Sequence, residues 1–419
     1  MTPHELRSLL RLRRPAVTGR DRVLSRTLSV SDLREAARRR LPRAIFDYLE
    51  GGADQEVTIH DNVERFSGYR WFPQALRGTA GPGLGCSVFG EDLPLPIGLA
   101  PTGYTRLFHA HGELAVARAA ARHGVPYTGA TLATTSLEEV AAASQAPLWF
   151  QLYQMRDWDL TRALVQRVEN AGYRVLQVTV DTAVAGRRVR DLRNGLTIPP
   201  TLTARTLLGI AGHVPYWLSL VRGRSIGFAN FASDSWPSAG NIASITERFE
   251  PAISWDHVAR LRETWKGAMV LKGPLGAEDV VRAVELGCDG VYLSNHGGRQ
   301  LDRVAHPLDL LVAARRAVGG KTTILLDSGI RCGADVAIAL ACGADFCLVG
   351  RPYLYGLAAA GQAGVEFVIG MIAEELGRTL QLLGLAGVAD LKAAGEGLVR
   401  YGGSPASRPV SRGDFEVPQ

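Results

Sequence analysis

The sequence predicts an α/β protein: a TIM (β/α)8 barrel with an N-terminal helical extension and a long insertion after strand 4. The first observation behind this prediction is a series of eight short apolar runs, separated by helical segments. Parallel strands that are buried on both faces read as such runs. An open doubly wound sheet gives a similar alternation, so the count of eight is what favours a closed barrel. The runs are Leu95–Ala100, Val125–Thr128, Leu148–Phe150, Val175–Val180, Met269–Leu271, Gly290–Leu293, Ile324–Leu326 and Phe346–Val349.

A second observation is that polar residues stand where the runs end. A buried strand has no use for these groups, whereas the C-terminal mouth of a barrel collects catalytic and ligand-binding side chains. We therefore expect one functional site at that mouth. The residues are Thr102, Thr131, Gln151 with Tyr153, Thr179 with Asp181, Lys272, Ser294 to His296, Asp327 with Ser328, and Gly350 with Arg351.

The third observation is a connection of more than seventy residues between Asp181 and the helix near Asp256. We expect a basic N-terminal arm over 1–30, the barrel over 31–395 with the insertion at 196–250, and a C-terminal tail over 396–419. The insertion holds apolar and aromatic residues, such as Val214–Leu218, beside arginines. This composition fits a segment in a membrane interface, and a lid helix packed on the barrel fits it equally well.

The N-terminal extension is expected to form two helices. The first begins with Ser31 or Asp32 as its N-cap and leads on to Arg40. The second holds Ala44–Leu49 and stops at Gly51 and Gly52, because glycine commonly follows a helix.

The composition excludes several classes of protein. Of the 419 residues, 46% are hydrophobic, which suits a large soluble core. The formal charge is +6, but residues 1–43 hold twelve Arg against four acids, a net of +8, so the remainder sums to −2. The body is therefore not a nucleic-acid surface. Five Cys without CxxC spacing indicate reduced thiols in a cytosolic protein. The chain contains no run of ~18 consecutive apolar residues, so no helix is expected to span a membrane.

The stretch Ser294–Asp302, SNHGGRQLD, follows the sixth run and is the most informative motif. Its two glycines let the backbone turn sharply and approach a ligand. His296 stands at the strand end, and Arg299 can face the same cavity. A base beside a fixed cation suits removal of a proton from a substrate that carries a carboxylate. A structural histidine that caps a turn is the alternative, and the combination favours the catalytic interpretation.

Glycine-rich turns after the seventh and eighth runs predict a phosphate site. Gly329 and Arg331 lie in the first turn, and Gly350 and Arg351 lie in the second. Two ordinary βα turns are the alternative. The chain has no G-x-G-x-x-G after a first strand and no G-x-x-x-x-G-K-[ST], which disfavours a Rossmann or P-loop nucleotide site.

Lys272 ends the fifth run, where a buried ammonium must find an anion. A flavin ring that becomes anionic on reduction would be such a partner, and a lysine that reaches solvent past the rim is the alternative. Asp181 could pair with His296 and stabilise its protonated form. Arg187, Arg188 and Arg190 are typical of a solvated face, although Arg188 could reach the mouth.

From about Leu28 to Leu391, the chain resembles the FMN-dependent 2-hydroxy-acid dehydrogenase/oxidase family, which includes mandelate dehydrogenase and glycolate oxidase. The phrases DSGIRCGAD, LAAAGQAGV and ISWDHV are most similar to its bacterial quinone-linked L-lactate dehydrogenase branch. The stretches that carry the resemblance are Ser294–Asp302, Asp327–Arg331, Leu99–Gly103, Phe150–Tyr153 and Thr179–Thr182.

The resemblance implies a role for each matching position. His296 would be the base, with Asp181 as its partner, and no metal is implied. Arg188 and Arg299 would clamp the substrate carboxylate, and Tyr48 and Tyr153 would hydrogen-bond the substrate carboxylate or hydroxyl. FMN would be held at its ring and ribityl chain by Ala100, Pro101, Thr102, Gln151, Thr179, Lys272, Ser294 and Asp327, and at its phosphate by Gly329, Arg331, Gly350 and Arg351.

Four positions distinguish the chain from relatives. Ala130 stands where many of them have a flavin-contacting Ser, so that hydrogen bond is lost unless Thr131 replaces it. Leu132 replaces a Trp and suggests a different side-chain pocket, and Val189 replaces a Glu that commonly follows the clamp arginine. Gly103, where oxidases often carry Ala, resembles the dehydrogenases.

The resemblance implies oxidation of an L-2-hydroxy acid, L-lactate first, to the 2-keto acid, with electrons passed to a quinone-type acceptor. Two alternatives are a hydroxy-acid oxidase that uses O2 on a glycolate-like, mandelate-like or larger acid, and an FMN-dependent isomerase barrel, which the Arg188 and Arg299 pair disfavours. We expect no nucleic-acid partner and a homo-oligomer, a tetramer by analogy. The expected location is cytoplasmic, with peripheral attachment to the inner face of the cell membrane as a further expectation.

Overall fold

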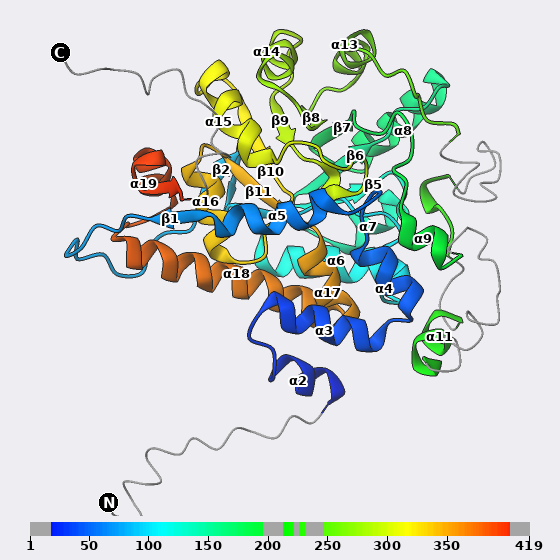
Figure 1. Cartoon of the computed structure of the whole chain (residues 1–419). Coiled ribbons are helices and arrows are strands. Elements are labelled where there is room, and N and C mark those ends of the chain that lie inside the picture. Colours follow the sequence, from blue (N-terminus) through cyan, green and yellow to red (C-terminus); the bar gives the residue numbers. More distant parts are fainter. Residues whose placement is uncertain (1–17, 196–212, 222–225, 232–246, 403–419) are drawn as a thin grey trace, which may run out of the picture.

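The computed structural model describes residues 18–195, 213–221, 226–231 and 247–402, and in them eight parallel strands close into a barrel (Figure 1). The strands follow one another around the barrel in chain order, and the last, β11, pairs with the first, β4. The predicted fold is confirmed, because each strand overlaps one predicted run. The strands are β4 (Ile97–Leu99), β5 (Tyr127–Ala130), β6 (Leu148–Leu152), β7 (Val175–Thr179), β8 (Ala268–Gly273), β9 (Gly290–Leu293), β10 (Thr323–Leu326) and β11 (Phe346–Val349).

An outer layer of helices surrounds the barrel. On α8 the buried apolar face is Leu164, Val165 and Val168, and the Asp157 carboxylate caps the helix start. Gly356 and Gly364 let two helices touch, since a Cβ on Gly356 would lie 2.3 Å from the Gly364 carbonyl oxygen. The helices are α6 (Gly112–His123), α7 (Leu137–Ala143), α8 (Trp158–Asn170), α13 (Trp255–Thr264), α14 (Ala277–Glu285), α15 (Pro307–Val318), α16 (Gly333–Ala341), α17 (Arg351–Ala360) and α18 (Gln362–Leu383).

Side chains fill the barrel interior, and a hairpin of β2 (Cys86–Val88) and β3 (Glu91–Leu93) covers its N-terminal end. Phe89 of this hairpin packs edge-on against the buried Trp149, with ring centroids 5.7 Å apart. Trp149 in turn meets Phe346 across the barrel. The barrel is therefore a packed core at this end, which leaves its C-terminal mouth for ligands.

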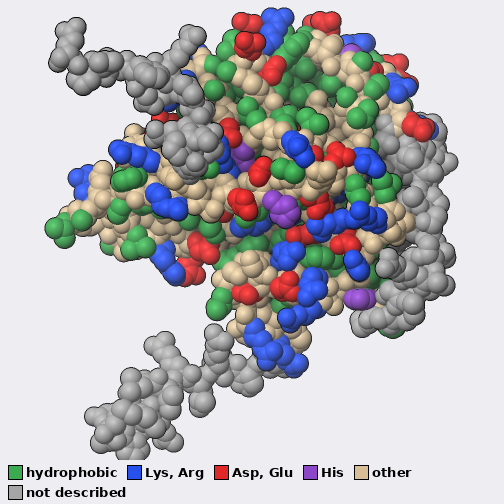
Figure 2. Space-filling model, in the orientation of Figure 1, with side chains coloured by type: hydrophobic (Ala, Val, Ile, Leu, Met, Phe, Trp, Pro, Cys, Tyr) green, Lys and Arg blue, Asp and Glu red, His purple; other side chains and the backbone are tan. Residues whose placement is uncertain are grey.

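Within the described residues, four helices precede the barrel: α2 (Gly19–Leu24), α3 (Val30–Arg40), α4 (Arg43–Glu50) and α5 (Val57–Ser67). The predicted N-cap of α3 was wrong, because the Ser29 hydroxyl accepts the Asp32 N–H and Asp32 lies inside the first turn. Gly51 ends α4 as predicted; a Cβ there would lie 2.7 Å from the Asp47 carbonyl oxygen. Lysine and arginine side chains gather over α2 and α3, so the described part of the arm is basic (Figure 2).

The remaining elements lie at the edges of the molecule. Strand β1 (Tyr69–Trp71) pairs antiparallel with β12 (Val399–Tyr401), a strand that lies in the segment expected to form the tail, 396–419. No helix within the described ranges is long and apolar enough to cross a bilayer. Short elements are α9 (Val189–Arg193), α11 (Val214–Val221), α19 (Val388–Ala394), η1 (Thr105–Leu107), η2 (Ala229–Phe231), η3 (His296–Gly298) and η4 (Gly395–Gly397).

The insertion lies only in part within the described residues, as does the arm. In α11, the Tyr216 hydroxyl donates to the Leu107 carbonyl at 2.7 Å, so one face of this helix packs on the barrel loops. Val214 and Leu218 are 51% and 46% exposed on the other face. Residues 1–17, 196–212, 222–225, 232–246 and 403–419, with the arginines predicted at the membrane interface, lie outside the described residues.

Candidate active site

A cleft that is partly open to solvent lies at the C-terminal ends of the strands. Most of the predicted site residues line it. Thr179, Asp181 and Ser294 do not, and stand directly behind side chains that do. The lining residues among those predicted are Tyr48, Ala100, Pro101, Thr102, Gln151, Tyr153, Arg188, Lys272, His296, Arg299, Asp327, Gly329, Arg331, Gly350 and Arg351.

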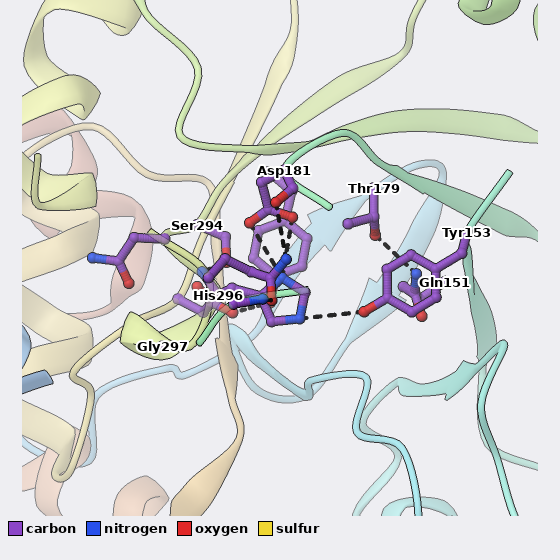
Figure 3. A network of polar contacts seen from close by, with 12 residues as sticks. Gln151, Tyr153, Thr179, Asp181, Ser294, His296 and Gly297 are labelled. Carbon is purple, nitrogen blue, oxygen red and sulfur yellow. Dashed lines mark hydrogen bonds and ion pairs between the residues drawn. The ribbon is translucent and has the colours of Figure 1, made fainter. Parts of the chain in front are cut away.

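His296 lies between Asp181 and Tyr153 (Figure 3). Its Nδ1 is 3.1 and 3.2 Å from the two Asp181 carboxylate oxygens, and its Nε2 is 3.3 Å from the Tyr153 hydroxyl. Because an ionised carboxylate only accepts hydrogen bonds, Nδ1 carries the proton of the neutral ring. The lone pair on Nε2 then faces Tyr153 and the cleft, where it can take a proton.

The protonation states follow from burial and nearby charge. Burial and the Lys272 ammonium lower the pKa of His296 below its ordinary value, against the opposing effect of Asp181. Burial alone would raise the pKa of Asp181, but the charges of His296 and Lys272 hold it below the ordinary range. Near neutral pH the imidazole is therefore an uncharged base and Asp181 is an anion. Burial raises the pKa of Tyr153, which stays a hydrogen-bond donor.

The backbone at His296 is strained. Its φ is +57°, in the left-handed region that a non-glycine residue adopts at a cost of roughly 1–3 kcal/mol. Two side chains hold this turn: the Ser294 hydroxyl accepts the His296 N–H at 3.1 Å, and the Asn295 side chain accepts the Gly298 N–H at 3.2 Å. Ser294 and Asn295 of the motif therefore fix the turn that orients the imidazole of His296.

Two guanidiniums face the cleft beside His296. Arg299 donates to the carbonyls of Tyr48 and Gly51 at 2.7 and 2.9 Å, and lies 5.0 Å from the centre of the Tyr48 ring. Arg188 donates to the Asp191 carboxylate at 2.9 Å. Burial and the charge of Arg188 both lower the pKa of Arg299, so the two cations repel. A substrate carboxylate placed between them relieves this repulsion.

The loop after β5 decides between two alternatives that the sequence left open. Ala130 lines the cleft, and the hydrogen bond of the missing hydroxyl was expected to be lost unless Thr131 replaces it. The Thr131 hydroxyl instead donates to the Gln151 carbonyl at 2.7 Å and accepts the Tyr153 N–H at 3.0 Å, and it is fully buried. Thr131 therefore supports Tyr153 and offers nothing to the cleft.

The middle of the cleft suits a flat ligand with an anionic edge. The Lys272 side chain is 3% exposed, lines the cleft, and forms no ion pair with a carboxylate of the described ranges. Gln151 donates to the Thr179 hydroxyl at 2.9 Å, which fixes the amide at the same level. Asp327 accepts from the hydroxyls of Tyr292 and Ser328, at 2.6 and 2.7 Å. The Asp181 carboxylate interacts with Lys272 electrostatically without forming an ion pair, and the anionic edge of a reduced flavin ring would give the ammonium a direct partner.

The other end of the cleft suits a phosphate. Gly350 and Arg351 form the start of the ten-residue helix α17, whose N–H groups carry partial positive charge. Burial lowers the pKa of Arg351 to about 10, so its guanidinium stays charged. Gly329 has φ +103°, and a Cβ there would lie 1.7 Å from the Asn62 carbonyl oxygen. With Arg331 also lining this end, the residues present fit the phosphate of FMN.

Three supporting residues were not predicted, although two belong to the SNHGGRQLD motif. Gln300 donates to the carbonyls of Asp181 and Val184 and accepts the Gly186 N–H, so it ties the loop after β7 to η3. Asp302 accepts N–H groups at the start of α5. Phe249 lines the cleft from the far end of the insertion, where no sequence pattern indicated a site residue.

Comparisons with known proteins give one matching family and several similar proteins. The model of the FMN-dependent dehydrogenase family matches residues 37–396. A Mycobacterium tuberculosis protein with the provisional name L-lactate dehydrogenase is 44% identical over 389 residues, which cover 92% of this chain and 93% of that protein. The L-lactate dehydrogenase of Stenotrophomonas maltophilia strain R551-3 is 41% identical, with 86% of this chain and 96% of that protein covered.

Solved structures are similar to this chain over most of its length. The monotopic membrane protein (S)-mandelate dehydrogenase superposes with a TM-score of 0.86 at 34% identity, and covers 90% of this chain and 100% of its own. A mandelate oxidase solved with benzoyl-formic acid superposes with a TM-score of 0.75 at 39% identity, covering 87% and 97% respectively. Both are barrel enzymes of the hydroxy-acid class, so the similarity extends from the sequence to the fold.

Proposed function

The chain belongs to the FMN-dependent dehydrogenase family, and on that premise we propose that it oxidises L-lactate or a close L-2-hydroxy acid and passes the electrons to a quinone-type acceptor. That it is an FMN-dependent enzyme of the 2-hydroxy-acid dehydrogenase/oxidase class follows from the family itself. The observation that carries the proposal is the convergence of His296, Arg188 and Arg299 on one cleft.

The protein's own residues divide the reaction between them. Arg188 and Arg299 bind the carboxylate and thereby bring C2 and its hydroxyl beside Nε2 of His296. His296 accepts one proton of the substrate, from C2 or from the hydroxyl, and the Asp181 carboxylate stabilises the resulting imidazolium. Tyr153 donates a hydrogen bond to a substrate oxygen. When bound, FMN would accept the two electrons together with the second hydrogen that the substrate loses, so the hydroxy acid would leave as the keto acid.

The choice of a dehydrogenase rests on Gly103 in the cleft. A Cβ at this position would lie 3.2 Å from the Leu132 carbonyl oxygen and 3.3 Å from the Leu132 Cβ, so the loop after β4 leaves little room for alanine. An oxidase that uses O2 is the second candidate, and the similarity to mandelate oxidase favours it. The paired arginines support a carboxylate substrate over an isomerase reaction.

One experiment tests the proposal directly. The purified yellow protein is mixed anaerobically with the L and D forms of lactate and mandelate, and flavin absorbance is followed. We expect L-lactate to bleach the flavin and D-lactate to leave it oxidised. A ubiquinone analogue should reoxidise the flavin faster than air-saturated buffer. Absence of bleaching by every 2-hydroxy acid would contradict the proposed function, whereas faster reoxidation by O2 would select the oxidase.

Attachment to a membrane surface is part of the same proposal. Val214 and Leu218 present an apolar face on α11, and the similar (S)-mandelate dehydrogenase is a monotopic membrane protein. Sedimentation with anionic lipid vesicles should carry the protein down, and Leu218→Ser should weaken this binding.

Homo-oligomer formation is a further part of the proposal and rests on analogy with relatives. Light scattering, which gives the mass of the particle in solution, tests it.

A further inference from the structure

The insertion returns to the barrel along the loop that follows β6. Residues 248–250 run antiparallel to residues 154–156: the Arg156 N–H donates to the Arg248 carbonyl at 2.8 Å, and the Glu250 N–H donates to the Gln154 carbonyl at 2.9 Å. The Arg156 side chain adds a hydrogen bond to the Phe249 carbonyl at 3.3 Å. The backbone of Phe249 is therefore fixed from both sides, although most of the insertion lies outside the described ranges.

This pairing places the Phe249 ring on Tyr153. The two ring centroids are 5.0 Å apart, with the planes inclined at 38°. Phe249 is 9% exposed, and both rings line the cleft. Tyr153 is held at its backbone by Thr131 and at its hydroxyl by His296, so Phe249 provides the lateral support of the ring between those two points.

We propose that Phe249 is a positioning residue, which holds the Tyr153 hydroxyl against Nε2 of His296 and so couples the insertion to the proton-transfer group. A tyrosine ring turns about two side-chain bonds, and a hydrogen bond of 3.3 Å restrains it weakly. Packing of a second ring removes this freedom and keeps water from the hydroxyl. The inference rests on the proposed function for the role of Tyr153.

The test is a double-mutant cycle with Phe249→Leu and Tyr153→Phe. Leucine keeps the site apolar and removes only the ring, so we expect kcat for L-lactate to fall about 2- to 10-fold with FMN content unchanged. In the Tyr153→Phe background the same change should alter kcat less than about twofold, because the hydroxyl it positions is gone. Phe249→Tyr, which keeps the ring, should restore most of the activity.

A matched control comes from the insertion itself. Phe231 is also buried, at 5% exposure, but does not line the cleft, so Phe231→Leu should leave kcat within about twofold. The cycle is repeated on the Kd of oxalate, measured by calorimetry, so that it does not depend on turnover. Non-additive effects on oxalate binding support the inference even if no hydroxy acid is oxidised. Equal effects of Phe249→Leu with and without the Tyr153 hydroxyl would overturn it.

Discussion

At the proton-transfer end of the cleft, His296 is held by side chains from the ends of two other strands, Asp181 after β7 and Tyr153 after β6. At the phosphate end, Arg351 is held by backbone: it donates to the carbonyls of Leu49, Gly51 and Gly297, at 3.2, 3.2 and 2.8 Å. The proton-transfer end thus depends on contacts between side chains, and the phosphate end depends on where the backbone carbonyls lie around Arg351.

This difference predicts which measured property a substitution at each end should change. A side chain removed from the proton-transfer end leaves the backbone in place, so the change should appear in the rate for each bound FMN. At the phosphate end a substitution disturbs loops that pack on α4 and α5, so it should appear in FMN retention and stability.

The largest effect is expected for His296→Ala. Without the base, kcat for L-lactate should fall by up to about 10⁴-fold, while the protein still purifies yellow with one FMN per chain. Stopped-flow bleaching gives the rate, and absorbance after denaturation gives the FMN content. Rapid reduction in this variant would remove His296 from the reaction, and loss of FMN would break the separation between the two ends.

The fold and most of the site were predictable from sequence for a physical reason. Buried parallel strands must be apolar, and polar groups at their ends, such as Lys272 and Asp327, can face only the mouth. The barrel geometry then brings residues from distant parts of the chain to one cleft. Closure of the barrel thus brings polar residues that are widely spaced in the sequence into one site.

Other features depended on contacts that no periodicity encodes. Gln300 stands in a recognisable motif, but its bonds to the Asp181 and Val184 carbonyls follow from how two loops cross. The sequence left open whether the Thr131 hydroxyl faces the cleft, and its bonds to the neighbouring strand turn it inward. Phe249 reaches the cleft through backbone pairing at the end of a long connection, so its position depends on tertiary structure alone.

The second prediction concerns the phosphate end. Gly329→Ala combines a φ of +103° with a Cβ placed 1.7 Å from the Asn62 carbonyl oxygen. We expect a loss of at least about 2 kcal/mol in the free energy of unfolding, together with loss of FMN on gel filtration. Gly78→Ala is the control: φ is +67° with open space around it, so only the conformational cost of about 1 kcal/mol applies. Equal stability losses in the two variants would show that the close approach to α5 does not matter.

The third prediction concerns Gln300, which holds the loop that carries Asp181. Gln300→Ala removes two donated hydrogen bonds and one accepted bond, each worth about 1 kcal/mol. We expect kcat/KM to fall about 10-fold, because both Asp181 and Arg188 gain freedom. Gln362→Ala, on the outer helix α18, removes a comparable bond far from the cleft and should leave kcat/KM unchanged. A wild-type value in Gln300→Ala would show that the loop needs no such tie.

The smallest effect, and the one in which the sign matters most, is on pH dependence. His296 must be uncharged to accept a proton, so kcat/KM should fall as the pH drops through its pKa, which burial and Lys272 hold below the ordinary 6.5. Lys272→Met removes a positive charge that opposes imidazolium formation, so the acid limb should move to higher pH. Asp181→Asn removes the carboxylate that favours imidazolium, so the acid limb of kcat/KM should move to lower pH. This shift is read from the position of the limb and is separate from any fall in the maximal value of kcat/KM. Limbs that move in the same direction in both variants would show that the titrating base is not flanked by these two charges.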